Sequence, residues 1–550
     1  MNSPDTRSTA VLAAELSRRE FLNFMGRSAL AAGALAVLPG CTTLTGSASR
    51  EVDLPFSPLQ PSPADALIFA PGFHYEILLR WGQSLNAHGD KFGFNNDYLA
   101  YVPLTPGQPL EGLLWVNHEY HDPFHNSGWK PGEGRTLEQV NGERKEVGGS
   151  IVHLRCTDGR WQMVENSRYN TRLDAFTPIP LIADRPIQGR RMAVGTFANC
   201  AGGMTPWGTV LTCEENYHYF VGEVEYSDGR RRHKEVPNYL SWGNLVDLPP
   251  EHYGWVVEVD LRTAKAKKLT ALGRFSHECA TTILASDGRV VVYSGDDAEQ
   301  EHLYKFISAK PGSLERGSLY VADLAKGRWL PLNQAKDPRL KKVFKDQTDL
   351  LIRTREAAKI VGATPLDRPE DIEIDKATGA VIVSLTNSKK TGNKFGSLLR
   401  LDEENRDPLS LRFESRQFLA GGPVTGFACP DNLAFDARGN LWMTTDMSGK
   451  VMNSPPYESF ANNGLFFIPM AGKDAGRAFQ VASAPIGAEL TGPCFAPDGR
   501  TLFLSVQHPG EHAFEDESKS SHWPDGGTAR PAPCVVAVQG PALERLLMGV

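Results

Sequence analysis

One pattern of hydrophobic and polar positions recurs along the chain. Each copy starts with polar or acidic residues, continues as a short apolar strand, turns at a segment containing Asp, Gly or Pro, and returns as a second apolar strand that ends in a polar residue. Two apolar strands around such a turn are typical of a β-hairpin. The chain has six copies, which begin near residues 95, 199, 277, 369, 430 and 492.

The spacing of the hairpins indicates how they assemble. Consecutive copies lie roughly 60 to 100 residues apart, more than the ~40 to 50 residues of a minimal four-stranded propeller blade. We therefore predict an all-β fold, a six-bladed β-propeller with long inter-strand insertions, because closing the ring leaves only short strand edges. An irregular pair of β-sandwiches is the alternative.

Polar residues gather where each hairpin starts and ends. In an antiparallel hairpin the start of the first strand and the end of the second lie at the same rim. The starts carry Asn95–Asp97, Asn199–Cys200, His277–Glu278, Arg368–Glu370 and Asp431–Asn432, and the ends carry Asn117–Glu119, Glu214–Asn216, Asp296–Asp297, Asn387 and Asp446. Carboxylates crowded at one mouth of a channel repel one another unless cations lie among them.

The residue types at this rim indicate which cations they would bind. Oxygen ligands suit calcium, and the candidates are Glu278, Glu370, Asp431 and either Asp296 or Asp297. Cys200 is a soft ligand that favours iron, zinc or copper, unless it is a buried structural cysteine. A mixed thiolate and carboxylate set fits a hydrolytic iron better than a closed zinc site.

The N-terminus predicts export. Ser17–Leu22 reads S-R-R-E-F-L and precedes an apolar, alanine-rich run over Ser28–Leu38, which is too short to span a bilayer. This is typical of a twin-arginine signal, which we place at residues 1–41, and Leu38–Cys41 also resembles a lipoprotein cleavage box that would lipidate Cys41. We expect a linker at 42–64, one propeller domain at 65–550, and a periplasmic or secreted protein that uses the twin-arginine translocation machinery.

Composition narrows the classes of partner. The 550 residues carry a formal net charge of −7, which gives no indication of nucleic-acid binding. Eight cysteines are too sparse for a disulfide scaffold. We expect a monomer without a membrane span.

Twelve motifs resemble one known family. They are FGFNNDY, VNHEY, SRYN, NCAGGMTPWGT, CEEN, YGWVVEVD, GRFSHE, YSGDD, RPEDIEID, PDNLAFDARGNLW, LTGPCFAPDGRTLF and VQHPGE, in the family's order between residues 92 and 511, and the resemblance covers about residues 65 to 540. The chain resembles the PhoX-type alkaline phosphatases, which are exported enzymes. The resemblance implies a six-bladed propeller that holds two oxo-bridged ferric ions and calcium ions and hydrolyses phosphomonoesters.

The resemblance also implies roles for particular residues. Carried over by motif, the metal ligands would be Cys200 and Glu278 on iron, one or both of Glu214 and Glu215, and Glu370, Asp431 and Asp296 or Asp297 on calcium. Arg368 and Asn199 would bind phosphate oxygens. Cys279 departs from the family, which typically has glycine there, and places a second sulfur beside Glu278.

The chemistry agrees with these roles. Phosphoryl transfer needs cations around the phosphate oxygens, and an arginine fork matches phosphate geometry. Two alternatives remain at this point: a calcium-dependent propeller esterase or lactonase, in which Cys200 would be structural, and a non-catalytic calcium-binding propeller.

Overall fold

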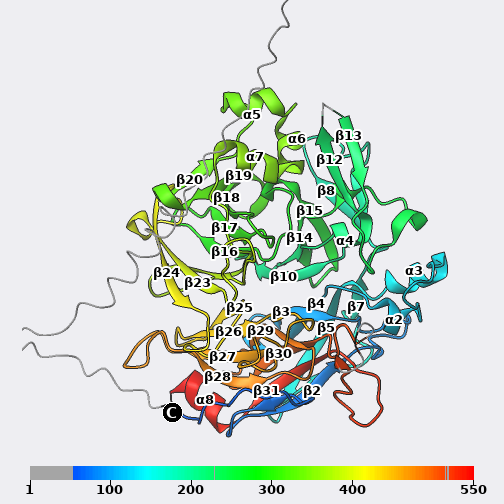
Figure 1. Cartoon of the computed structure of the whole chain (residues 1–550), viewed down its shortest axis with the longest axis vertical. Helices are drawn as coiled ribbons and strands as arrows, with labels where there is room; N and C mark the ends of the chain where they lie inside the picture. The colour runs from blue at the N-terminus through cyan, green and yellow to red at the C-terminus, as the bar shows by residue number, and fades with distance from the viewer. Residues whose placement is uncertain (1–53, 228–229, 514–515, 517–518, 550) are drawn as a thin grey trace, which may run out of the picture. The chain divides into compact units, whose positions relative to one another are not determined.

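Six largely antiparallel sheets carry the six predicted hairpins. The computed structural model describes residues 54–227, 230–513, 516 and 519–549, so the predicted signal, including Cys41, lies outside the described residues. In every sheet the first strand of the hairpin forms one edge and the second strand is its neighbour. These edge strands are β3, β10, β16, β21, β25 and β29, and most of their labels gather near the middle of Figure 1.

The first three blades follow the chain from residue 96 to residue 331. Blade one contains β3 (Asn96–Thr105), β4 (Gln108–His118), β5 (Gly148–Thr157), β6 (Arg160–Met163) and β7 (Thr171–Leu173). Blade two contains β8 (Pro178–Ile182), β9 (Met192–Val194), β10 (Asn199–Met204), β11 (Val210–Glu214), β14 (Val256–Asp260) and β15 (Lys265–Leu269). Blade three contains β16 (Thr281–Leu284), β17 (Val290–Gly295), β18 (Leu303–Lys310), β19 (Ser313–Asp323) and β20 (Arg328–Pro331).

The other three blades include strands from both ends of the described chain. Blade four contains β21 (Pro369–Ile374), β22 (Val381–Leu385), β23 (Ser397–Glu403) and β24 (Phe413–Ala420). Blade five contains β25 (Pro430–Phe435), β26 (Leu441–Thr445), β27 (Gly464–Ile468), β28 (Phe479–Ser483) and β1 (Ile68–Phe69). Blade six contains β29 (Glu489–Phe495), β30 (Leu502–Gln507), β31 (Cys534–Gln539) and β2 (His74–Arg80).

The predicted insertions form short elements between the blade strands. They are the hairpin β12 (Glu223–Ser227) and β13 (Arg230–Lys234), and the helices α2 (Pro123–Asn126), α3 (Leu137–Glu143), α4 (His218–Val221), α5 (Pro338–Val343), α6 (Gln347–Ile352), α7 (Thr354–Val361) and the C-terminal α8 (Pro541–Met548). The 3₁₀ turns include η1 (Gly243–Leu245), η2 (Pro250–His252), η3 (Thr270–Leu272), η4 (Leu324–Lys326) and η5 (Glu404–Arg406). Among the described residues no helix combines the length and the apolar character needed to cross a membrane.

The edge strands close into a ring. Strand β3 contacts β10 and β29, and the contacts continue from β10 to β16, β21, β25 and back to β29. The N-terminal β2 pairs with β31, so the two ends of the described chain complete the same blade. This arrangement confirms the predicted six-bladed propeller and excludes the pair of sandwiches.

Apolar side chains fill the spaces between neighbouring blades. Between blades two and three, for example, Leu211 and Val256 pack with Val292 and Phe306, all fully or almost fully buried. Burying a side chain of this size stabilises the fold by roughly 1.5–3 kcal/mol. Tight packing between blades holds the ring of edge strands in place, and that ring positions the site.

Candidate metal centre

Four hairpins begin with the same unusual backbone geometry. The residues before β3, β10, β21 and β25 have left-handed φ angles of 50°, 54°, 53° and 52°, and they are Asn95, Ala198, Arg368 and Cys429. In each case the next residue pairs with the second strand, and the pairing then shifts by a β-bulge. A bulge leaves its extra residue unpaired and re-aims the side chain.

The bulge residues are the acidic and thiol side chains of the rim. Two positions after the left-handed residue lie Asp97, Cys200, Glu370 and Asp431. In blade three, Glu278 takes the same place, because it follows His277, which bridges Asp296 before β16 begins. In blade six the bulge holds Gly492 instead, where a Cβ atom would lie 2.7 Å from the carbonyl oxygen of Asp97.

The second strands deliver a second set of side chains to the same rim. In the four hairpins with a left-handed start, the residue that follows the second strand donates its N–H to the carbonyl of the left-handed residue. The bonds run from Glu119 to Asn95, Glu215 to Ala198, Thr386 to Arg368 and Asp446 to Cys429. In blade three, Asp297 donates to Ser276 in the same way. Backbone hydrogen bonds therefore fix which residue of each strand end lies at the rim.

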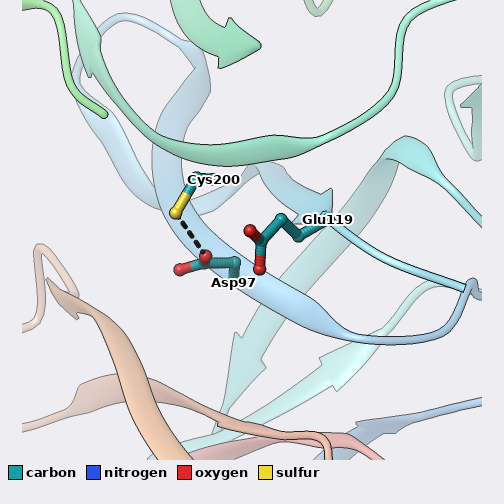
Figure 2. Close-up of side chains that lie close together, drawn as sticks. All are labelled: Asp97, Glu119 and Cys200. Atoms are coloured by element: carbon teal, nitrogen blue, oxygen red, sulfur yellow. Dashed lines mark hydrogen bonds between the residues drawn. The ribbon is translucent and has the colours of Figure 1, made fainter. Parts of the chain in front are cut away.

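Seven of these side chains form three overlapping groups. The groups are Asp97, Glu119 and Cys200; Cys200, Glu215 and Glu278; and Glu278, Glu370 and Asp431. Within each group, one potential ligand atom per residue lies within 4.8 Å of the others. Cys200 Sγ lies 3.3 Å from Asp97 Oδ2 and 3.1 Å from Glu278 Oε1. Figure 2 shows Asp97, Glu119 and Cys200 with their sulfur and oxygen atoms facing one another.

Burial and mutual repulsion raise the pKa values of this cluster. Burial, reinforced by the Glu119 carboxylate, raises the pKa of Asp97 to about 8, and burial raises the pKa of Glu119 to about 7. Burial and neighbouring carboxylates hold the pKa values of Glu215, Glu278, Glu370 and Asp431 well above their ordinary values. Such groups keep their charge only if cations compensate it.

Unpartnered oxygens indicate where cations would fit. Among the described residues, neither Asp97 Oδ1 nor Glu278 Oε2 has a hydrogen-bond partner, although both are buried. A buried oxygen without a donor is costly, and a metal ion relieves that cost. The carboxylates suit a hard ion, whereas Cys200, which shares both of its groups with carboxylates, suits a transition metal. The residues present therefore fit a mixed metal centre.

The structure brings together five of the eight predicted metal ligands, namely Cys200, Glu215, Glu278, Glu370 and Asp431. Glu214 instead accepts a 2.5 Å hydrogen bond from Lys268, and Asp296 pairs with the Arg355 guanidinium. Both lie one residue before the rim position. Successive side chains of a strand point to opposite faces, which separates them from Glu215 and Asp297.

The other predicted residues have distinct surroundings. Asp297 accepts 2.8 and 2.7 Å hydrogen bonds from Arg368, which also lies 2.7 Å from Glu370 Oε1. The Arg368 side chain is 25% exposed and so is open to a ligand at the rim. Asn199 is fully buried, and its side-chain N–H groups donate to Thr196 and Thr212. The thiol of Cys279 is buried and lies 3.7 Å from the Glu370 carbonyl, outside the three groups.

Two members of the cluster are not among the residues predicted to bind metal. Asp97 and Glu119 occupy the bulge and strand-end positions of the first hairpin, as Cys200 and Glu215 do in the second. The signal was present in the sequence, since both residues stand at the polar start and end of that hairpin. Applying one positional rule to every hairpin would have found them.

Comparisons with known proteins identify a family and a similar fold. Residues 54–510 match the family model of alkaline phosphatase PhoX. The structure of Pseudomonas fluorescens PhoX in complex with vanadate, a transition-state analogue, is similar to this chain with a TM-score of 0.77 and 29% identity, and the match covers 89% of this chain and 98% of that chain. No match was found among curated proteins.

More distant structures share much less. A protein of unknown function from Dyadobacter fermentans has 7% identity and a TM-score of 0.37, covering 86% of this chain and 100% of that chain. Trypanosoma rangeli sialidase has 10% identity and a TM-score of 0.35, covering 87% of this chain and 61% of that chain. These two carry no argument about the site. The match to the family model spans most of the sequence, and this chain belongs to the PhoX alkaline phosphatase family.

Proposed function

We propose that this chain hydrolyses phosphomonoesters at a mixed centre of iron and calcium held by the seven clustered side chains. The observation that carries the proposal is that five blades each direct an acidic or thiol side chain to one rim, beside a partly exposed arginine. Membership of a phosphatase family supports the reaction class.

The ligand types indicate which side chains would hold iron and which would hold calcium. Cys200 contacts Asp97 and Glu278, so the thiolate and these carboxylates would hold iron, joined by Glu119 and Glu215. Glu370 and Asp431, which lie with Glu278 in an all-carboxylate group, would hold calcium. When bound, these ions would supply positive charge to the phosphate oxygens and activate a water-derived nucleophile. This position of Cys200 disfavours the alternative of a calcium-only esterase, in which Cys200 would have a structural role.

Arg368 would orient the substrate. Its guanidinium is held by both oxygens of Asp297 and stays partly open, so it can donate to a phosphate oxygen without losing its orientation. Asp446 Oδ2 lies 3.8 Å from a guanidinium nitrogen of Arg368 and adds to the negative charge that holds this side chain in place. We further propose that Asp297 serves the centre through Arg368.

The N-terminal motif supports export by the twin-arginine machinery, which transports folded proteins and would carry the loaded centre to the periplasm or the outside. Small phosphomonoesters are the proposed substrates, and a monomer is the proposed state. The sequence and the family membership support the export and substrate proposals.

The test is hydrolysis of p-nitrophenyl phosphate by the full chain, with its iron and calcium measured per chain. We expect activity that a chelator removes and that iron with calcium restores. Cys200→Ser should lose about 100-fold or more in kcat/KM, since each metal supplies several kcal/mol of transition-state stabilisation. The control is Cys156→Ser, a half-buried cysteine in blade one outside the cluster. A chain that contains both metals and does not hydrolyse the ester would contradict the proposal.

A further inference from the structure

A buried chain of hydrogen bonds leads from the interior of blade two to the backbone of Cys200. It begins at the charged pair of Lys268 and Glu214, in which Lys268 Nζ also donates to the His252 carbonyl at 3.0 Å. It then passes through three polar side chains and ends in blade one. In order, its members are Lys268, Glu214, Thr196, Asn199, Thr212 and Asn117, and each of them is 0% exposed.

Every link has a defined donor. The Asn199 amide donates to Thr196 Oγ1 and Thr212 Oγ1, both at 2.9 Å. The Thr196 hydroxyl donates to Glu214 Oε1 at 2.9 Å, and the Thr212 hydroxyl donates to Asn117 Oδ1 at 2.7 Å. Each hydroxyl has one hydrogen, and an ionised Glu214 can only accept. Thr196 therefore donates its hydrogen to Glu214 and accepts from the Asn199 amide.

At its far end, the hydrogen-bond chain holds the backbone segment that carries Cys200. Asn117 donates one side-chain hydrogen to the carbonyl of Ala201 at 3.1 Å and the other to the carbonyl of Cys200. Its own oxygen also accepts from Trp115 Nε1 at 2.6 Å, which fixes the amide orientation. These bonds hold both carbonyls of the bulge from which the Cys200 side chain extends.

We propose that Asn117, Thr212, Asn199 and Glu214 are positioning residues that fix the direction of the Cys200 thiol. The inference rests on the proposed function, because it assumes that Cys200 binds a metal. Glu214 and Asn199 then act on the centre through the backbone of Cys200 rather than by touching metal or phosphate. The Asn199 amide nitrogen and Glu214 Oε1 bond to other members of this hydrogen-bond chain.

The test is Thr212→Val, which keeps the shape of the side chain and removes the single hydroxyl that joins Asn199 to Asn117. The metal-free full chain is titrated with Co²⁺, and the absorption of the thiolate–cobalt bond is followed. Loss of outer-shell partners typically weakens metal affinity 10- to 100-fold, so we expect about 10-fold weaker binding and an altered band. Thr212→Ser keeps the hydroxyl and should bind Co²⁺ as the wild type does.

Thr501→Val is the matched control. Thr501 is also fully buried and donates a 2.7 Å hydrogen bond to Asp498, but it lies at the turn between β29 and β30, away from the rim. Its substitution should lower stability without changing the band. If Thr212→Val does not fold, Thr196→Val interrupts the hydrogen-bond chain at a second point and should weaken Co²⁺ binding to the same extent.

Two results would overturn the inference. One is a folded Thr212→Val or Thr196→Val chain with the wild-type cobalt affinity and band. The other is a wild-type chain that binds Co²⁺ with no thiolate band, which would remove Cys200 from the centre. Chelator-sensitive hydrolysis of p-nitrophenyl phosphate in that second case would leave the phosphatase proposal standing, so the two failures are distinguishable.

Discussion

Buried carboxylates occupy two kinds of environment in this molecule. Inside the blades, Glu214 pairs with Lys268 and Glu403 pairs with Lys305, so each negative charge has its own cation. At the rim of the channel, six carboxylates and one thiol lie together, accompanied by Arg368 at Glu370. The two blade-interior pairs are therefore neutral as pairs, whereas the rim carboxylates outnumber the cationic side chains beside them.

The difference arises between adjacent residues. Glu214 and Glu215 are both buried, yet one faces Lys268 within the blade and the other faces Cys200 and Glu278. Asp296 and Asp297 also face different ways, since Asp296 pairs with Arg355 inside the blade and Asp297 pairs with Arg368 at the rim. The alternation of strand side chains, locked by the strand-end hydrogen bonds, decides which acid is structural and which is available to a metal.

Breaking a complete pair should have the largest effect on stability. Glu403 accepts hydrogen bonds from Lys305 at 2.8 Å, Tyr293 at 2.7 Å and Trp329 at 3.1 Å. Glu403→Gln leaves the Lys305 charge buried and unpaired, which should destabilise the fold by about 3–5 kcal/mol. Urea unfolding of the wild type and the variant measures this difference. A loss below about 1 kcal/mol would show that the blade interior does not depend on the pair.

The stability of the metal-free chain should depend on pH through the rim carboxylates, whose charges lack a compensating cation. The pKa values of Asp97 and Glu119 rise to about 8 and about 7 in the folded state, above ordinary values of 3.8 and 4.5. The folded chain therefore binds more protons than the unfolded chain between these limits, and its stability falls as pH rises. At ~1.4 kcal/mol per pH unit for each retained proton, the two groups together should lower the stability of the folded chain by about 2.5 kcal/mol between pH 5 and pH 6.

Loading the metals should reverse that slope, because metals bind the deprotonated ligands and their affinity increases with pH. The measurement is the free energy of unfolding at both pH values, with and without iron and calcium. Equal slopes in the two forms would mean that the rim carboxylates are not the ligands.

The sequence predicted the scaffold of the site well, because the hairpin pattern is local. The predicted starts near 199, 369 and 430 coincide with the first residues of β10, β21 and β25. Short apolar strands around an Asp or Gly turn determine their own pairing, and closure then brings their polar ends to one rim. Cys200, Glu278, Glu370 and Asp431 could be placed together on that basis alone.

The division between neighbouring acids could not be predicted in this way. Distinguishing Glu214 from Glu215 requires the strand register and the position of the bulge, and a bulge shifts the simple alternation by one residue. The cations that neutralise the inner acids come from distant segments: Lys268 lies 54 residues from Glu214, and Arg355 lies 59 residues from Asp296. Only the folded contacts reveal these partners.

The smallest expected effect is that of Glu278→Gln in the metal-free chain. It should be opposite in sign to the effect of Glu403→Gln. Folding at pH 8 forces Glu278 to take up a proton or to carry a charge beside Glu370, Glu215 and Asp431, whereas glutamine avoids both costs. Part of the gain is offset because the contact between Cys200 and Glu278 Oε1 changes. We expect a net stabilisation of about 1 kcal/mol at pH 8 and almost none at pH 5. Urea unfolding at both pH values, beside Glu403→Gln, tests it. Destabilisation of the metal-free chain as large as that of Glu403→Gln would place Glu278 among the structural acids, and would mean that the rim carries its own compensation.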